Sequence, residues 1–157
     1  MSKFQLKNFF KEAYDLMLVF LQFFIISLHF FQWEFLPEKQ IIQASPFSHF
    51  LGILIIIIAF IIMLVSIKDL GRNLSPFPRP INNSNLVTTG VYRFTRHPMY
   101  YSLIFISIGF FIIKLSIYYL FLTISLALII KFKISLEEKY LMNKFKNYLL
   151  YKNEVKI

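Results

Sequence analysis

A run of 32 apolar residues, 99–130, reads MYYSLIFISIGFFIIKLSIYYLFLTISLALII and carries a single charge, Lys114. One helix of that length would be about 48 Å long, well beyond the ~30 Å hydrocarbon core of a bilayer. A tight turn near Lys114 would instead give two helices of nearly membrane length. The run therefore predicts a helical hairpin, with spans at about residues 98–113 and 115–131.

Two further apolar stretches precede the hairpin and predict spans at about residues 14–33 and 50–67. The chain is 57% hydrophobic and contains 20 Phe, more large apolar side chains than a soluble domain of 157 residues could bury. No repeat or linker divides it. We expect an all-α membrane bundle of four transmembrane helices with a cytoplasmic C-terminal helix, in a single domain over residues 1–157.

The positive charges alternate between the connecting segments. Lys and Arg number three before the first span, one in the first loop, five in segment 68–96, one at Lys114 and seven from Lys131 onward. By the positive-inside rule this pattern predicts that both termini are cytoplasmic, in a bacterial inner membrane or the endoplasmic reticulum. The net charge of +9 does not indicate nucleic-acid binding, because the basic residues form no interleaved surface with aromatic ones.

Several classes of chemistry are excluded by composition. The chain has no cysteine, so it has no disulfide, no thiol nucleophile and no thiolate metal site, and we predict no metal centre.

The first apolar run ends at Phe31 without a small-residue cleavage site, which favours a retained first helix over a signal peptide.

The central loop, residues 68–98, is the only long polar stretch between the spans. Three prolines, Pro76, Pro78 and Pro80, oppose helix and favour a defined extended path. Pro98 suits the first position of the third helix. Arg96 and His97 would then lie at that helix's N-terminus, where backbone N–H groups favour an anion. The alternative is a simple interfacial anchor that binds lipid headgroups.

The tail is expected to continue the fourth helix through Tyr148. If the last two spans form a hairpin, Glu137 and Glu138 return to the membrane face that carries Arg96 and His97. Such a site would suit a zwitterionic ligand with a positive centre, such as S-adenosylmethionine, with tyrosine faces near the sulfonium. The alternative is a surface ion pair between Glu137 and Lys133, which would contribute little to stability.

Three segments together resemble the isoprenylcysteine carboxyl methyltransferase and phospholipid methyltransferase group of membrane enzymes. The central one reads Leu86-Val87-Thr88-Thr89-Gly90-Val91-Tyr92-Arg93-Phe94-Thr95-Arg96-His97-Pro98-Met99-Tyr100. It is preceded by Gly71-Arg72-Asn73 and Pro76-Phe77-Pro78-Arg79-Pro80 and followed by Glu137-Glu138, Leu141, Phe145, Tyr148, Tyr151 and Val155. The resemblance covers roughly residues 68–155.

The resemblance implies an S-adenosylmethionine-dependent methyltransferase with a cofactor site in segments 68–101 and 131–155. It implies these cofactor-binding residues: His97, Tyr100, Glu137, Glu138, Arg96, and, as pocket-shaping positions, Gly90 and Tyr92. The acceptor would be lipophilic and would enter from the bilayer. Carboxyl O-methylation of an isoprenylcysteine is the first expectation, and a phospholipid amine or a small thiol is the alternative. No catalytic base can be named.

The chain departs from the family pattern at three places. Lys146 replaces the glycine after Phe145, Ser102 replaces a glycine after Tyr100, and Val155 is followed by Lys156-Ile157 in place of Pro-Arg. Two rival classes stay open. One is a sterol-reductase-like oxidoreductase that binds NADPH, which shares the Arg-His-Pro-x-Tyr element, and the other is a non-catalytic member of the same fold.

Overall fold

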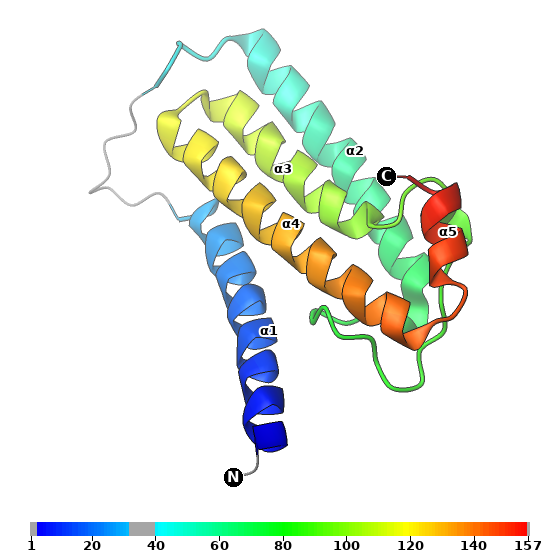
Figure 1. Cartoon of the computed structure of the whole chain (residues 1–157). Coiled ribbons are helices and arrows are strands. Elements are labelled where there is room, and N and C mark those ends of the chain that lie inside the picture. Colours follow the sequence, from blue (N-terminus) through cyan, green and yellow to red (C-terminus); the bar gives the residue numbers. More distant parts are fainter. Residues whose placement is uncertain (1–2, 32–39, 157) are drawn as a thin grey trace.

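The computed structural model describes residues 3–31 and 40–156, and these form helices and loops without a named strand. Figure 1 shows the five helices: α1 (Lys3–Leu28), α2 (Pro46–Leu70), α3 (Pro98–Lys114), α4 (Ile117–Lys144) and α5 (Tyr148–Glu154). Two short 3-10 helices, η1 (Gly71–Asn73) and η2 (Gly90–Arg93), lie in the central loop. The all-α prediction is confirmed. The end of the first predicted span, at Trp33, lies outside the described residues.

The hairpin predicted from residues 99–130 is present as α3 and α4. Helix α3 begins at Pro98, as expected, and ends at Lys114. Leu115 then takes a left-handed conformation, with φ of 45°, and its N–H donates to the carbonyl of Phe111. The Ser116 side chain accepts from the N–H of Tyr119 and caps α4, as serine does at helix starts. A two-residue connection therefore reverses the chain.

Helices α2 and α3 approach closely through two glycines. A Cβ on Gly52 would lie 2.7 Å from the carbonyl oxygen of Gly109, and a Cβ on Gly109 would lie 2.9 Å from that of Gly52. Small residues at such crossings allow backbones to come together, which drives helix association in membranes. The pair brings the start of α2 beside the end of α3.

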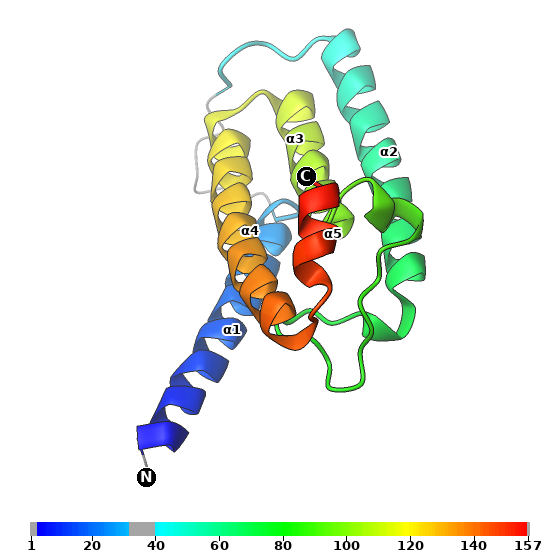
Figure 2. The same ribbon diagram turned by 45° about the vertical axis from the view of Figure 1, so that its right-hand side comes forward.

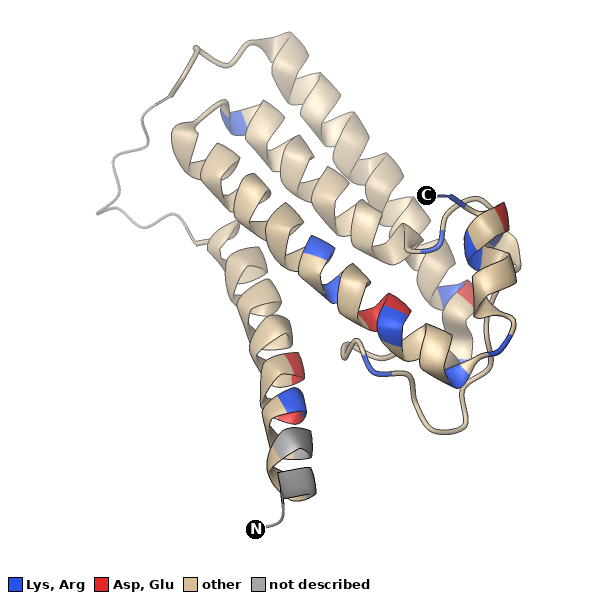
Figure 3. Cartoon of the chain, viewed as in Figure 1, with Lys and Arg blue, Asp and Glu red and all other residues tan. Residues whose placement is uncertain are grey.

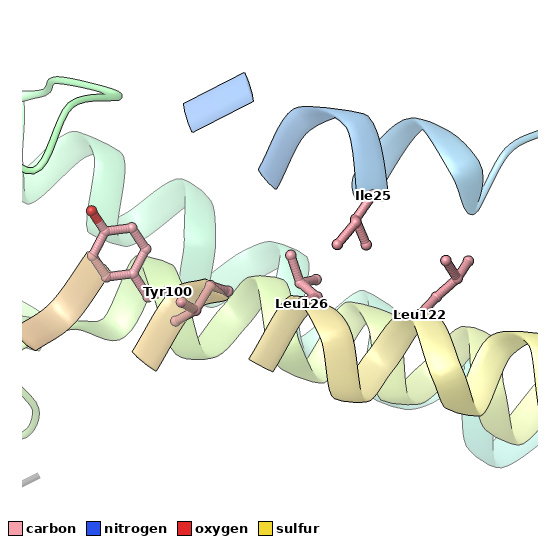
Figure 4. Packing of buried hydrophobic residues seen from close by; sticks show 5 residues of the cluster. Ile25, Tyr100, Leu122 and Leu126 are labelled. Carbon is pink, nitrogen blue, oxygen red and sulfur yellow. The ribbon is translucent and has the colours of Figure 1, made fainter. Parts of the chain in front are cut away.

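Helix α1 runs along α4 with a narrow buried face. The buried positions recur every three or four residues, at Asp15, Leu18, Gln22, Ile25 and His29, which is the spacing of one helix face. Figure 4 shows Ile25 packed toward Leu122 and Leu126 of α4, with Tyr100 of α3 in the same cluster. The α3–α4 hairpin is therefore flanked by α2 on one side and α1 on the other (Figure 1).

Two of the four predicted spans meet the length and hydropathy expected of a membrane-crossing helix. These are Pro46–Asn73 and Ile117–Lys144, and Pro98–Lys114 is a shorter apolar helix. The apolar part of α4 ends at Ile130, and its remaining residues form a polar extension of about 20 Å by helix geometry. Lys, Arg, Asp and Glu gather on α1, that extension, α5 and the central loop (Figure 3). Helix α3 ends at Lys114, at the opposite end of the bundle.

The expectation that the fourth helix continues through Tyr148 is wrong. Helix α4 ends at Lys144, Phe145 is extended, and α5 folds back beside α4 and the central loop (Figure 2). Burial explains the break. Tyr148, Tyr151 and Val155 form a buried cluster with Leu86, Leu141 and Phe145. The apolar area removed from water in this cluster outweighs the modest helix propensity of the connecting residues.

Candidate active site

A pocket lies where the central loop, the start of α3, the polar end of α4 and α5 meet. Its lining includes five of the seven residues predicted for the cofactor site: Tyr92, Arg96, His97, Tyr100 and Glu137. The other two, Gly90 and Glu138, lie next to this lining and are not part of it. The hairpin thus returns the tail to the central loop, as the sequence predicted.

The proline-rich part of the central loop forms one wall of the pocket and is tied down at both sides. Arg79 pairs with Asp15 of α1 at 3.0 Å. On the other side, Lys144 of α4 donates to the carbonyl of Asn82 at 2.9 Å. Pro78 is fully buried. This loop therefore has a defined path, as its prolines predicted.

Gly90 shapes the pocket without lining it. Its φ is +62°, a conformation that only glycine adopts easily. A Cβ at this position would lie 2.0 Å from the Asp69 carboxylate. That carboxylate accepts from the N–H of Val91 at 2.8 Å, which fixes the turn leading to Tyr92.

Glu138 is held by basic side chains from two distant segments. Its Oε1 accepts from Arg96 Nε at 2.9 Å, and its Oε2 accepts from Lys152 Nζ at 2.6 Å. His97 Nε2 lies 3.4 Å from Oε1. Contact with His97 and the pairs with Lys152 and Arg96 hold the pKa of Glu138 well below its usual range, although burial opposes this. Both oxygens are therefore committed within the protein.

Glu137 is the opposite case. It lies about two helical turns beyond the apolar part of α4, lines the pocket, and has an Oε2 atom that is buried without a hydrogen-bond partner. Burial raises the pKa of Glu137, and the charges of His97 and Lys133 and a hydrogen bond with Tyr100 lower it. The alternative of a surface ion pair with Lys133 is wrong, because Lys133 is buried and Glu137 is partly buried.

Two other pocket-lining groups carry buried polar atoms without a hydrogen-bond partner: His97 Nε2, whose contact with Glu138 lacks hydrogen-bond geometry, and the Tyr148 hydroxyl. Buried polar groups in native proteins are nearly always paired. Three unpaired atoms around one pocket, of Glu137, His97 and Tyr148, indicate a polar ligand.

Helix α5 forms one side of the pocket, which Tyr148 and Tyr151 line. The Tyr151 hydroxyl donates to the carbonyl of Tyr92 at 2.6 Å, and Arg96 donates to the carbonyl of Val155. Burial raises the pKa of Tyr151 to about 12, so it remains a donor at neutral pH. The Arg96 side chain thus joins α3, α4 and the C-terminal segment.

Sequence reasoning missed three residues that organise this region: Asp69, Lys133 and Lys152. Gly90 indicates a tight turn that another side chain has to fix in place. No rule of sequence spacing identifies Asp69 as that side chain. Lys133 and Lys152 looked like ordinary basic residues of a cytoplasmic tail. Their roles depend on partners that lie far away in the sequence.

The described residues contain no group of three or more His, Asp or Glu side chains that could hold a metal ion. A family model described as phospholipid methyltransferase matches residues 47–148, which include α2, the central loop and the α3–α4 hairpin. No significant match was found among curated proteins or among solved structures.

Proposed function

The chain belongs to the phospholipid methyltransferase family, and from this premise we propose that it transfers the methyl group of S-adenosylmethionine to a lipophilic acceptor in the membrane. The observation that carries the proposal is the set of three unpaired buried polar atoms, of Glu137, His97 and Tyr148, around one pocket. The pocket also presents tyrosine rings, which favour a cationic centre.

Five residues would hold the cofactor: His97, Tyr100, Glu137, Tyr92 and Arg96. Glu137 would accept from an amine or a ribose hydroxyl, and the start of α3 with Arg96 would meet a carboxylate. Glu138 would act indirectly, by fixing Arg96 and α5, and Gly90 by shaping the turn to Tyr92. When bound, the cofactor supplies an electrophilic methyl group on a sulfonium.

The protein's contribution is then alignment and exclusion of water. The pocket lies beneath α5 and behind the proline-rich wall, so a nucleophile held there would react without competition from solvent. We assign no catalytic base for transfer to a carboxylate. Transfer to a carboxylate requires none, which is why a prenylated cysteine carboxyl is our first candidate acceptor.

A phospholipid amine is the second candidate, and the family description favours it. In that case the ammonium must lose a proton before the N–CH₃ bond forms. The free Oε2 of Glu137 is a carboxylate oxygen without a partner that lines the pocket, and it would be a suitable proton acceptor.

An apolar groove on α2 and α3 offers a route for the acceptor's hydrocarbon chain. It has a volume of about 640 Å³ and is lined by Ile55, Ile58, Ala59, Ile62, Thr95, Pro98, Tyr101, Ser102 and Phe105. Thr95 and Pro98 flank Arg96 and His97, which line the polar pocket. Residues that line the groove are therefore sequence neighbours of residues that line the pocket. On this basis we assign the groove to the acceptor's hydrocarbon chain.

We further propose that the single domain crosses the membrane four times, with both termini cytoplasmic and the pocket at the cytoplasmic face. The charge distribution supports this orientation. In this orientation the groove would lie in the bilayer and the cofactor pocket would be in reach of the cytoplasm.

Two measurements test the function. S-adenosylmethionine, but not NADPH, should raise the thermal unfolding midpoint of the purified protein. If NADPH raises the midpoint instead, the protein is better explained as a reductase. If neither ligand raises the midpoint, the protein is better explained as a non-catalytic member of the fold. Methyl-labelled cofactor should then label a lipid in membrane extracts. A base-labile product identifies a carboxyl ester, and a base-stable product an amine or thioether.

A further inference from the structure

Lys133 is a charged side chain in a place where charges are rarely found. It is 1% exposed, on α4 one turn before Glu137 and just beyond the apolar part of the helix. An unpaired ammonium buried in this way would be strongly destabilising. The contacts around the Lys133 ammonium group must therefore offset the cost of burying its charge.

Three contacts hold the ammonium group. It donates to the Gln22 side chain of α1 and, at 3.0 Å, to the carbonyl of Pro76 in the proline-rich wall. It also lies 5.2 Å from the ring centre of Tyr100, in cation–π range. Lys133 thus joins α1, α4, the start of α3 and one wall of the pocket, although it does not line the pocket itself.

Its charge acts on the pocket through Glu137. The groups whose charges or hydrogen bonds act on the Glu137 carboxylate are His97 and Tyr100 of α3, Lys133 and Glu138 of α4, Tyr92 of η2 and Tyr148 of α5. Of these groups, only His97 and Lys133 can carry a positive charge, and both lower the pKa of Glu137. The negative charge of Glu138 raises that pKa. Lys133 therefore supplies a second cation behind the pocket, and its charge lowers the pKa of Glu137 against the larger effect of burial.

We propose that Lys133 is a positioning residue of the cofactor site, which holds the Pro76 wall and Tyr100 in place and sets a cation behind the Glu137 carboxylate that meets the ligand. This inference rests on the proposed function, because it takes Glu137 as a cofactor contact. It adds a role to a residue outside the pocket.

The test compares Lys133→Met with Lys131→Met, which removes an exposed lysine from the same helix two residues away. S-adenosylmethionine affinity would be measured by calorimetry in nanodiscs from pH 6 to 9. We expect at least a tenfold loss for Lys133→Met at pH 7, less than a twofold change for Lys131→Met, and recovery to within threefold of wild type for Lys133→Arg.

The pH profile separates an electrostatic role from a merely structural one. Without the nearby cation the pKa of Glu137 rises, so in Lys133→Met the affinity should be lowest at acidic pH and recover as pH increases. Adding Glu137→Gln to Lys133→Met should remove this pH dependence. If Lys133→Met does not fold, Lys133→Gln supplies the same comparison.

A Lys133→Met protein that binds like wild type would overturn the inference, as would a loss that is equal at every pH. In both cases the wild type still binds S-adenosylmethionine, so the proposed function survives. Absence of binding by the wild type would overturn the function and the inference with it.

Discussion

The two adjacent glutamates do different work, although they are one step apart in the sequence. Glu137 faces the pocket with an unpaired oxygen, whereas Glu138 is engaged by Arg96 and Lys152. A helix rotates by about 100° per residue, so neighbouring side chains meet different surroundings. The family motif alone cannot assign the two roles, because it contains both residues.

Glu137→Gln should weaken S-adenosylmethionine binding by about 10- to 100-fold, because a charge-assisted hydrogen bond contributes roughly 1.5–3 kcal/mol. The thermal unfolding midpoint without ligand should not fall. The substitution removes a carboxylate charge whose Oε2 is buried without a hydrogen-bond partner. Calorimetry and thermal unfolding check the two parts. Unchanged affinity would contradict the assignment of Glu137.

Glu138→Gln should show the reverse order of effects. Loss of one partner from a buried ion-pair cluster costs about 3 kcal/mol, so the unfolding midpoint should fall and α5 should become accessible to protease. Binding should weaken only as a consequence, and saturating cofactor should partly restore protection of α5. Normal stability with abolished binding would make Glu138 the direct contact instead.

At the scale of single residues, the sequence predicted which residues gather and missed how they are connected. His97, Tyr100 and Glu137 were brought together by the hairpin, which follows from hydropathy and helix length. Lys133 was considered only as a surface partner of Glu137, because a lysine in a basic tail is usually solvated. Its burial depends on Gln22 and Pro76, and no local pattern links these three positions.

At the scale of helices, the hairpin and the start of α3 were predictable because proline, serine and apolar runs act locally. The break between α4 and α5 was not. Residues 145–148 have a helical pattern in isolation, but their aromatic side chains pack back onto Leu86 and Leu141. Tertiary packing overrides propensity at such places.

The close crossing of α2 and α3 predicts a strong effect of side-chain size. Gly109→Leu would place atoms within 2.5 Å of Ile56 and 2.9 Å of the Gly52 carbonyl at the Cβ alone. Overpacking of this kind costs about 1–3 kcal/mol, and the helices would separate. We expect Gly109→Leu to have a lower thermal unfolding midpoint than the wild type. Gly52→Leu should lower the midpoint much less in the Gly109→Leu background than it does alone.

The groove on α2 and α3 can be tested with two neighbouring isoleucines. Ile58 lines the groove and is 50% exposed, whereas Ile57 is 51% exposed and does not line it. Ile58→Trp should raise the KM for the lipid acceptor at least fivefold and leave cofactor affinity unchanged, because the indole fills the groove. Ile57→Trp should leave both unchanged. Equal KM values for the two variants would exclude the groove as the acceptor's route.

At the scale of the whole molecule, composition and charge predicted an all-helical membrane protein with its polar groups at one end, and the arrangement of charged residues agrees with this (Figure 3). Length and hydropathy support two crossings among the described residues. Helix α1 has buried polar residues at Asp15, Gln22 and His29, which lower its hydropathy. The number of spans therefore needs a direct measurement.

The absence of cysteine makes that measurement clean, because a single introduced thiol is the only one. Lys11→Cys and Asn147→Cys should react with a membrane-impermeant maleimide only after cells are permeabilised. Gln43→Cys should react in intact cells. Labelling of Lys11→Cys and Gln43→Cys from the same side would refute the first of the four crossings.

The contacts of Glu138 with Arg96 and Lys152 have a consequence for the biosynthesis of the protein. Lys152 contacts Glu138 and the Val155 carbonyl contacts Arg96, and both residues leave the ribosome after the four proposed spans. The bundle can therefore be inserted and packed while its pocket is still incomplete. Completion of the site therefore follows insertion of these spans, and a chain interrupted before α5 would leave Glu138 without Lys152 and Arg96 without the Val155 carbonyl, with a loss of stability like that expected for Glu138→Gln.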